Sequence, residues 1–287
     1  MIGVALTAHL LDAGVEVFAL VRPGSPHAGR LAPRPGLKLV ETDLSALAHV
    51  SLPAVPGAAF FHLGWVGSDG KSRGDASLQD RNVAWSLGAV RLAAKIQAGV
   101  FLFAGSQAEY GRVEGTITAD TPPHPDTPYG RAKLEAESRC AAACREAGIR
   151  FGGLRIFSVY GPFDGENTLI SYLIRSFQRA ESPKLTPCGQ TWNYLYALDA
   201  ARAVALVATL GRDGAIYNLA SDDTRPLRSY VEELRAIVNP EVTVDYGAVP
   251  YAENQVMNLR VDTTPLQRDT GFSPACPFED AIKEMLR

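Results

Sequence analysis

Short apolar runs alternate with longer stretches of helical periodicity through the first half of the chain. The first periodic stretch covers residues 4–13 and ends at Gly14, and a buried strand over residues 16–21 follows it. The same alternation predicts strands over 37–40, 58–62, 100–103 and 151–159, and helices over 44–50, 75–98 and 129–147. Strands that alternate with helices are typical of an α/β protein with a parallel sheet.

The alternation loosens after residue 160. Helices are predicted over 168–180, 200–210, 227–238 and from residue 278, and segment 215–219 is typical of a strand that returns to the main sheet. We therefore expect a sheet domain made of residues 1–160 and about 196–222. The remaining residues, about 161–195 and 223–287, would form a smaller lobe.

Tyr129 and Lys133 lie four residues apart in the predicted helix 129–147. Side chains at this spacing project from one helix face, so the ammonium of Lys133 can lie close to the phenol. A unit charge at about 5 Å in an effective dielectric of about 20 contributes roughly 3 kcal/mol, or about two pKa units. The pair is therefore a candidate acid/base in which the pKa of the phenol is lowered towards neutrality.

Ser106 follows the predicted strand 100–103 at its carboxyl end, where open parallel sheets bind their ligands. A serine hydroxyl at that position can hydrogen-bond a substrate oxygen. Together with Tyr129 it would move a proton on or off a carbinol while hydride moves elsewhere. Ser106, Tyr129 and Lys133 are thus the predicted catalytic residues.

Composition and charge exclude several classes of function. The chain has 287 residues, a net charge of -3 and a pI near 6.0, which give no basic footprint for nucleic acid or an anionic membrane. Neither a signal peptide nor an apolar run long enough to span a bilayer is recognisable. The four cysteines form no C-x-x-C pair, and no metal site is expected. We therefore expect a cytoplasmic protein.

Several short motifs follow one another in a characteristic order. They are Thr42-Asp43-Leu44, Phe61-His62-Leu63, Gly105-Ser106 with Tyr110-Gly111, Pro128-Tyr129-Gly130-Arg131-Ala132-Lys133, Leu154-Arg155 with Tyr160-Gly161-Pro162, and Gly189-Gln190-Thr191. With them the chain resembles the extended short-chain dehydrogenase/reductase family, in its NAD(P)-dependent nucleotide-sugar epimerase, dehydratase and reductase branch. The resemblance covers nearly the whole chain and implies a Rossmann-type doubly wound parallel sheet with a smaller C-terminal substrate-binding lobe.

The resemblance also implies roles for single residues. Tyr129 would be the acid/base, Lys133 would hold the nicotinamide ribose and lower the pKa of the tyrosine, and Ser106 would contact the substrate oxygen. The predicted cofactor-binding residues are Gly3, Arg22, Asp43, Leu44, Leu63, Gly64, Tyr129 and Lys133. The predicted substrate-binding residues are Ser106, Gln107, Ser158, Trp192, Arg225 and Arg260. The residues interpreted as scaffold are His62, Asn82 and Arg155.

One departure from the family pattern narrows the reaction. In the sugar 4,6-dehydratases of this branch, an Asp-Glu pair directly follows the catalytic serine or threonine and eliminates water, whereas here Gln107 and Ala108 take those positions. Glu109 comes one residue later and, in an extended segment, points to the opposite side. A dehydratase is therefore disfavoured, and an epimerase or a keto-reductase is expected.

A second departure lies in the sugar-nucleotide lobe. Trp192 stands where the family often has an arginine that binds the diphosphate, and Asn193 replaces the usual aspartate. Trp192 can stack on a base or pack in the core. Arg225 and Arg260 are alternative phosphate partners, and each can equally be a solvated surface charge.

The choice of dinucleotide depends on the residues after strand 16–21. An acidic residue there would bind the 2'-hydroxyl of NAD, whereas this chain has Arg22 followed by Ser25. Because an arginine with a nearby serine suits a 2'-phosphate, NADP(H) is favoured over NAD.

The beginning of the chain departs most from the family. The family opens with a strand and a Gly-x-x-Gly-x-x-Gly turn that binds pyrophosphate at a helix N-terminus, and here only Gly3 matches, as the last glycine. The missing strand is central in a doubly wound sheet, so its loss leaves unpaired backbone groups in two neighbouring strands. We expect either that the native chain begins upstream of Met1 or that another segment fills the gap.

Together these features predict an NAD(P)-dependent epimerase or 4-keto-reductase that acts on a nucleotide-diphosphate sugar. The alternatives are a reductase of a non-sugar carbonyl and a catalytically silent cofactor-binding regulatory protein of the same fold. The presence of Ser106, Tyr129 and Lys133 favours an enzyme. The resemblance further suggests a homodimer formed through helices 75–98 and 129–147.

Overall fold

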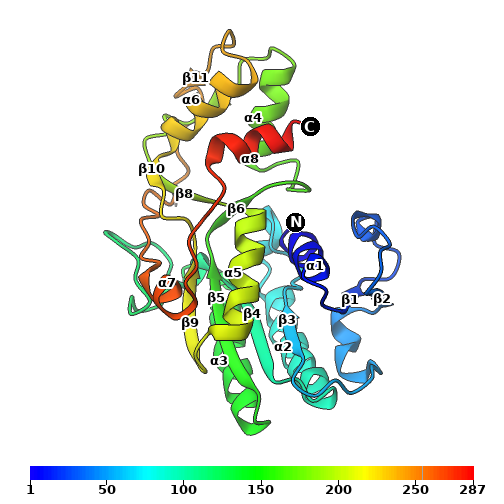
Figure 1. Ribbon diagram of the computed structural model, residues 1–287. Helices are drawn as coiled ribbons and strands as arrows, with labels where there is room; N and C mark the ends of the chain where they lie inside the picture. Colours follow the sequence, from blue (N-terminus) through cyan, green and yellow to red (C-terminus); the bar gives the residue numbers. More distant parts are fainter. Residues whose placement is uncertain (254) are drawn as a thin grey trace.

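The computed structural model describes residues 1–253 and 255–287. Its main sheet is parallel and consists, in spatial order, of β3 (Ala59–His62), β4 (Val100–Ser106), β5 (Arg150–Ile156) and β9 (Ala215–Leu219) (Figure 1). A separate parallel pair is formed by β1 (Val17–Val21) and β2 (Leu37–Glu41), with the short helix η1 (Ala28–Arg30) between them in sequence. The predicted strands 16–21, 37–40, 58–62, 100–103 and 215–219 are all confirmed.

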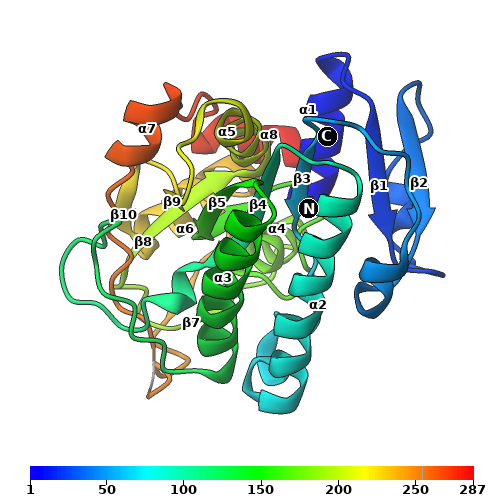
Figure 2. The ribbon, with the colours of Figure 1, turned by 90° about the horizontal axis from the view of Figure 1, so that it is seen from below.

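Helices cover both faces of the main sheet. One face carries α1 (Ile2–Asp12) and α5 (Ala197–Leu210), and the other carries α2 (Ala76–Lys95) and α3 (Pro128–Glu146) (Figures 1 and 2). Neighbouring residues of β4 pack to opposite sides, because side chains alternate along a strand. Leu102 packs with α5, whereas Phe101 and Phe103 pack with α2 and α3. The doubly wound α/β arrangement is therefore as predicted.

Local signals set the ends of the two long helices. Thr127 caps α3 by accepting a hydrogen bond from the Gly130 amide at 3.1 Å, and Pro128 occupies the first helical position. Asp75 caps α2 by accepting a hydrogen bond from the Leu78 amide at 3.0 Å. Asp43 caps the short helix η2 (Leu44–His49) in the same way, through the Ser45 amide.

The predicted strand 151–159 is divided in two. After β5 the Phe157 amide still bonds the Leu219 carbonyl in β9, but β6 (Ser158–Tyr160) pairs in parallel with β8 (Thr191–Tyr196) in another sheet. On its other edge β8 pairs with β10 (Thr224–Pro226). The sequence analysis missed β8, β10 and α7 (Thr264–Thr270).

The remaining elements form a smaller lobe at the carboxyl end of the main sheet (Figure 1). It contains α4 (Leu169–Gln178), α6 (Leu227–Val238), α8 (Phe278–Met285) and the short parallel pair β7 (Lys184–Leu185) and β11 (Asp245–Tyr246). Its core is apolar and aromatic, with Phe177, Tyr230 and Ile282 almost fully buried. The helices predicted over 168–180, 227–238 and from residue 278 are confirmed.

The two parallel sheets are separated at the place where the sequence analysis expects a missing strand. Within the described residues, β1 pairs only with β2 and β3 pairs only with β4, and no segment pairs between β1 and β3. All five residues of β1 are only partly buried, whereas all seven residues of β4 are buried. No helix in the described part of the chain is long and apolar enough to cross a membrane.

Candidate active site

Ser106, Tyr129 and Lys133 lie together where β4 ends and α3 begins. Ser106 is the last residue of β4 and caps η4 (Gln107–Glu109), accepting a hydrogen bond from the Ala108 amide at 3.2 Å. Tyr129 and Lys133 occupy successive turns of α3, and all three side chains are buried. Gly130 permits this approach, because a Cβ there would lie 2.4 Å from the Ala108 carbonyl oxygen.

Burial raises the pKa of Tyr129, and this effect outweighs the groups that favour the phenolate. A hydrogen bond with Ser106 and the charge of Arg73 act in the opposite direction, and Glu109 adds to the rise. The spacing of Tyr129 and Lys133 predicted a lowered pKa, so the direction of that prediction is wrong for this structure. The cause is desolvation, which the sequence pattern does not report.

The ammonium of Lys133 is held away from the phenol. Its Nζ donates a hydrogen bond to the Ala104 carbonyl oxygen at 2.6 Å and lies 3.9 Å from the ring centroid of Trp65. The distance to the ring centroid of Tyr129 is 5.9 Å. Burial lowers the pKa of Lys133, while Glu109 opposes that change. Burial, with a contribution from Lys133, also lowers the pKa of His62 to about 3.

A buried ionic network lies beneath these residues. One carboxylate oxygen of Glu109 accepts a hydrogen bond from the Ser106 amide at 2.6 Å, and the other contacts Nε of Arg155 at 2.8 Å. Nη2 of Arg155 contacts Glu137 at 2.8 Å, which links β5 to α3. Burial raises the pKa of Glu109, and Arg155 acts against it. The carboxylate of Glu109 is therefore engaged with the protein core.

A loop between β3 and α2, residues 64–75, covers the outer side of Tyr129 and Lys133. Trp65 meets the ring of Tyr129 edge-on, with 6.1 Å between centroids. Arg73, in the short helix η3 (Gly70–Gly74), lies over the same ring, with its guanidinium carbon 4.3 Å from the centroid. Two buried side chains of α2, Gln79 and Asn82, hold the loop by hydrogen bonds to its backbone.

The predicted cofactor-binding residues fall into two groups. In the first group, Leu44 packs against Gly64, where an added Cβ would lie 2.8 Å from Cδ2 of Leu44. Leu63 packs near Gly3, where an added Cβ would lie 3.7 Å from Cδ1 of Leu63. Arg22 and Asp43 are exposed and follow the neighbouring strands β1 and β2.

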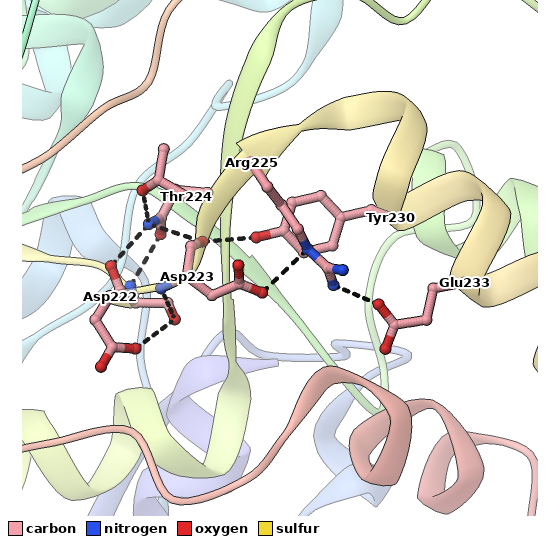
Figure 3. A network of polar contacts seen from close by, with 8 residues as sticks. Asp222, Asp223, Thr224, Arg225, Tyr230 and Glu233 are labelled. Atoms are coloured by element: carbon pink, nitrogen blue, oxygen red, sulfur yellow. Dashed lines mark hydrogen bonds and ion pairs between the residues drawn. The ribbon is translucent and has the colours of Figure 1, made fainter.

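The predicted substrate-binding residues of the lobe are more dispersed. Ser158 begins β6 opposite Tyr194, and Trp192 packs between two hydrophobic clusters with no described partner for its buried Nε1. Figure 3 shows Arg225 between Asp223 and Glu233. Its Nε lies 3.1 Å from Oδ2 of Asp223, and its Nη2 lies 2.5 Å from Oε2 of Glu233. Its guanidinium also lies over Tyr230. Binding of phosphate by Arg225 stays a prediction, and its pairing with two carboxylates gives that prediction no support.

Two other polar residues of this region have distinct surroundings. Asn193, which replaces the usual aspartate, is fully buried and joins β8 to the Ser221 backbone through two hydrogen bonds, at 2.7 and 2.9 Å. Arg260 is exposed and takes part in none of the ion pairs between described residues. Of the two predicted phosphate partners, Arg260 is therefore the one whose charge is not compensated by a described carboxylate.

The sequence pattern does not predict the residues that surround the cluster of Ser106, Tyr129 and Lys133. Glu137 lies four residues after Lys133, and the helical spacing is a signal for a second polar residue on the buried face of α3. Trp65 and Arg73 lie in an irregular loop, where no periodicity indicates which way they point. Among the described residues, no group of three or more His, Cys, Asp or Glu is placed to hold a metal ion.

The doubly wound sheet, with Ser106 at the carboxyl end of β4 and with Tyr129 and Lys133 on α3, agrees with the resemblance to the extended short-chain dehydrogenases/reductases. The sequence model of the NAD dependent epimerase/dehydratase family matches residues 1–220, and the chain belongs to that family.

Individual relatives are more distant. A dTDP-glucose 4,6-dehydratase of Streptomyces griseus is 28% identical over 187 residues, which are 63% of this chain and 56% of that protein. A UDP-glucose 4-epimerase of Thermotoga maritima, solved with UDP-glucose, superposes with a TM-score of 0.88 at 22% identity, covering 100% of this chain and 94% of that one. RMD of Pseudomonas aeruginosa, in complex with NADPH, gives a TM-score of 0.82 at 21% identity, with 100% and 94% covered. The two structures share the fold with this chain.

Proposed function

We propose that the chain is an NAD(P)-dependent oxidoreductase or isomerase that acts on a nucleotide-diphosphate sugar, as an epimerase or a 4-keto-reductase. The observation that carries this proposal is the buried cluster of Ser106, Tyr129 and Lys133 at the carboxyl end of β4. Membership of the epimerase/dehydratase family supports it, as do relatives whose names include nucleotide-sugar enzymes.

In this mechanism, Tyr129 transfers a proton to or from the sugar oxygen, while the Ser106 hydroxyl hydrogen-bonds that same oxygen. The dinucleotide supplies or accepts the hydride. Lys133 would hold the nicotinamide ribose. Glu109 fixes the Ser106 backbone through the 2.6 Å hydrogen bond from the amide. Because Trp65 and loop 64–75 cover the cluster, water has little access to the reacting atoms.

Several residues support the binding of a dinucleotide, although Gly3 is the only glycine of the family's pyrophosphate turn in this chain. Gly3 lies in the first turn of α1, where helix amides favour phosphate, and Leu63 packs beside it. Asp43 and Leu44 would flank the adenine. Arg22 lies exposed after β1, where it would meet a 2'-phosphate, and on this basis we propose a preference for NADP(H).

Water elimination is not part of the proposal, although a 4,6-dehydratase is among the relatives. Gln107 and Ala108 cannot act as the acid and base of elimination. Glu109 is the nearest carboxylate in sequence, and its oxygens are engaged by the Ser106 amide and by Arg155. Its burial and partners support a structural role.

The domain division also remains a proposal. In it, residues 1–160 and about 196–222 bind the dinucleotide, and about 161–195 and 223–287 bind the sugar nucleotide. The substrate contacts would come from Gln107, Ser158, Trp192 and Arg260. We further propose a homodimer formed through α2 and α3.

Calorimetric titration with NADPH and with NAD, followed by a screen of nucleotide-diphospho-sugars and their 4-keto forms, tests the proposal. We expect the chain to bind NADPH more tightly than NAD. We also expect it to convert at least one of the sugar nucleotides. Conversion of a non-sugar carbonyl instead would favour the reductase alternative. Binding of a dinucleotide without any turnover would favour the regulatory alternative.

A further inference from the structure

Loop 64–75 is fixed to α2 by a dense set of hydrogen bonds. The side-chain amide of Gln79 donates to the Gly67 and Ser72 carbonyl oxygens at 2.8 and 2.9 Å, and its oxygen accepts from Nε1 of Trp65 at 2.8 Å. Asn82 bonds both the N–H and the carbonyl of Val66, each at 2.9 Å. The loop is therefore a defined structural part of the site.

Close packing confirms that the loop is held in place. Gly67 has φ of 74°, and a Cβ there would lie 2.6 Å from Cδ2 of Leu78 in α2. Only glycine adopts this conformation without strain and leaves room for the helix. The loop therefore holds Trp65 and Arg73 against the ring of Tyr129.

Arg73 is the cation that this loop places against the phenol. Its guanidinium carbon lies 4.3 Å from the ring centroid of Tyr129, whereas Nζ of Lys133 lies at 5.9 Å and donates to a backbone carbonyl. Arg73 takes part in none of the ion pairs between described residues, so its charge is not compensated by a described carboxylate. A guanidinium over an aromatic ring is attracted to the ring, and more strongly once the ring carries negative charge.

We propose that Arg73 is a positioning residue of the acid/base site, which holds the ring of Tyr129 against Trp65 and stabilises the phenolate through the ring face. This inference rests on the proposed role of Tyr129. It assigns to a loop residue the cation that lies nearer the centroid of the Tyr129 ring, while Nζ of Lys133 lies over the ring of Trp65. Because Arg73 acts on the ring face, the phenol oxygen stays free to reach Ser106 and a substrate oxygen.

The other groups that face Tyr129 define what the test must separate. Ser106 faces the phenol from the end of β4, Glu109 faces it from η4, and Lys133 lies one turn along α3. Burial and Glu109 raise the pKa of Tyr129, whereas Ser106 and Arg73 lower it. Substitution of Arg73 removes one of these charges and keeps the side chains of Ser106, Glu109 and Lys133 in the chain.

The experiment follows the ionisation of Tyr129 directly and needs no substrate. The full chain is labelled with fluorotyrosine, whose fluorine brings phenol titration to lower pH, and the Tyr129 resonance is assigned with Tyr129→Phe. Fluorine NMR titrations then compare wild type with Arg73→Gln, Arg73→Lys and Lys71→Gln. Lys71 is the matched control, because it is an exposed cation of the same short helix that makes no contact with the ring.

We expect Arg73→Gln to raise the titration midpoint of Tyr129 by about one pH unit. Arg73→Lys should restore most of the shift, and Lys71→Gln should leave the midpoint unchanged. Equal midpoints in wild type and Arg73→Gln would overturn the proposal. An equal rise in Lys71→Gln, or no titration of wild-type Tyr129 before unfolding, would overturn it as well. A failure of the proposed function would show instead as absent turnover, which this titration does not involve.

Discussion

β4 and β1 are apolar strands that run in parallel arrays of the same protein, yet their surroundings differ sharply. β4 has a strand on each edge and a helical layer on each face, and all seven of its residues are buried. β1 has one described partner strand, and its five residues are only partly buried. The proposed catalytic cluster lies at the end of β4, whereas Arg22 follows β1 and is exposed.

The comparison shows that the residues proposed for proton transfer are packed more tightly than the residues proposed to bind the adenosine end of the cofactor. The residues proposed for proton transfer lie beside buried hydrogen bonds and ion pairs that connect β4, β5 and α3. The residues proposed to bind the adenosine end of the cofactor, Arg22 and Asp43, follow the strands of a sheet that has only two described strands. We therefore expect substitutions near β4 to cost stability, and the β1–β2 sheet to open first.

The largest effect is expected from Arg155→Ala, which leaves Glu109 and Glu137 buried without their shared cation. A buried pair broken at one partner costs about 3–5 kcal/mol. Urea denaturation measures the change, and Arg139→Ala is the matched control because Arg139 forms an exposed pair with Glu135. The control should cost less than about 1 kcal/mol. Equal losses in the two variants would remove the buried network from this account.

Gly130→Ala should have the next largest effect. The added Cβ would meet the Ala108 carbonyl at 2.4 Å and push α3 away from η4, at a cost of about 1–3 kcal/mol. Tyr129 and Ser106 belong to the two segments that meet at this contact. The substitution should therefore lower the turnover rate even under conditions where the variant is fully folded. Steady-state rates and denaturation midpoints measure both, with Gly29→Ala as the control, because nothing lies within 4 Å of its Cβ position. Unchanged turnover in Gly130→Ala would contradict the close docking of α3.

His62 should make the stability of the buried region fall in acid. Its Nε2 lies 2.9 Å from Oγ of Ser86, and burial lowers its pKa to about 3. Below pH 6.5 the unfolded histidine binds a proton that the folded one excludes, so stability is present above that pH and is lost as the pH falls. Between pH 7 and 5 the contribution of His62 to this loss should be about 2 kcal/mol. Denaturation at the two pH values should show a smaller loss in His62→Asn, and an unaltered loss in the exposed-site control His49→Asn.

The smallest effect expected is a difference in local opening. Amides of β1 and β2 should exchange with solvent at least about tenfold faster than those of β4, a difference of about 1.4 kcal/mol in opening free energy. Hydrogen exchange followed by mass spectrometry measures both strands in one sample. Protection of β1 equal to that of β4 would show that the free edge does not weaken the smaller sheet.

The sequence was sufficient for most of the architecture, because the elements are amphipathic or fully apolar and have clear end signals. Asp43, Asp75 and Thr127 cap helices that begin within one residue of their predicted first residues. The division of segment 151–159 was not predictable, because Phe157 continues the apolar run while the chain leaves the main sheet. β8 was missed because its mixed aromatic and polar residues lack clean alternation.

The candidate site was predictable in its members and not in its electrostatics. The order of the motifs predicted that Ser106, Tyr129 and Lys133 share one site, and the three residues are neighbours in the structure. The pKa of Tyr129 is raised by burial, whereas the sequence predicted that it is lowered. The burial comes in part from the loop that covers the ring, and the sequence pattern does not show where that loop lies. Arg73 reaches the ring through an irregular loop, and sequence spacing does not encode that contact.

Turnover in wild type and in Tyr129→Phe, measured on the sugar nucleotide that the screen identifies, tests the central claim most directly. Dinucleotide affinity is measured on the same samples by calorimetry. The account predicts that Tyr129→Phe binds the dinucleotide nearly as wild type does and loses turnover by at least about 100-fold, because the phenol proton has no replacement. Undiminished turnover in Tyr129→Phe would contradict the account.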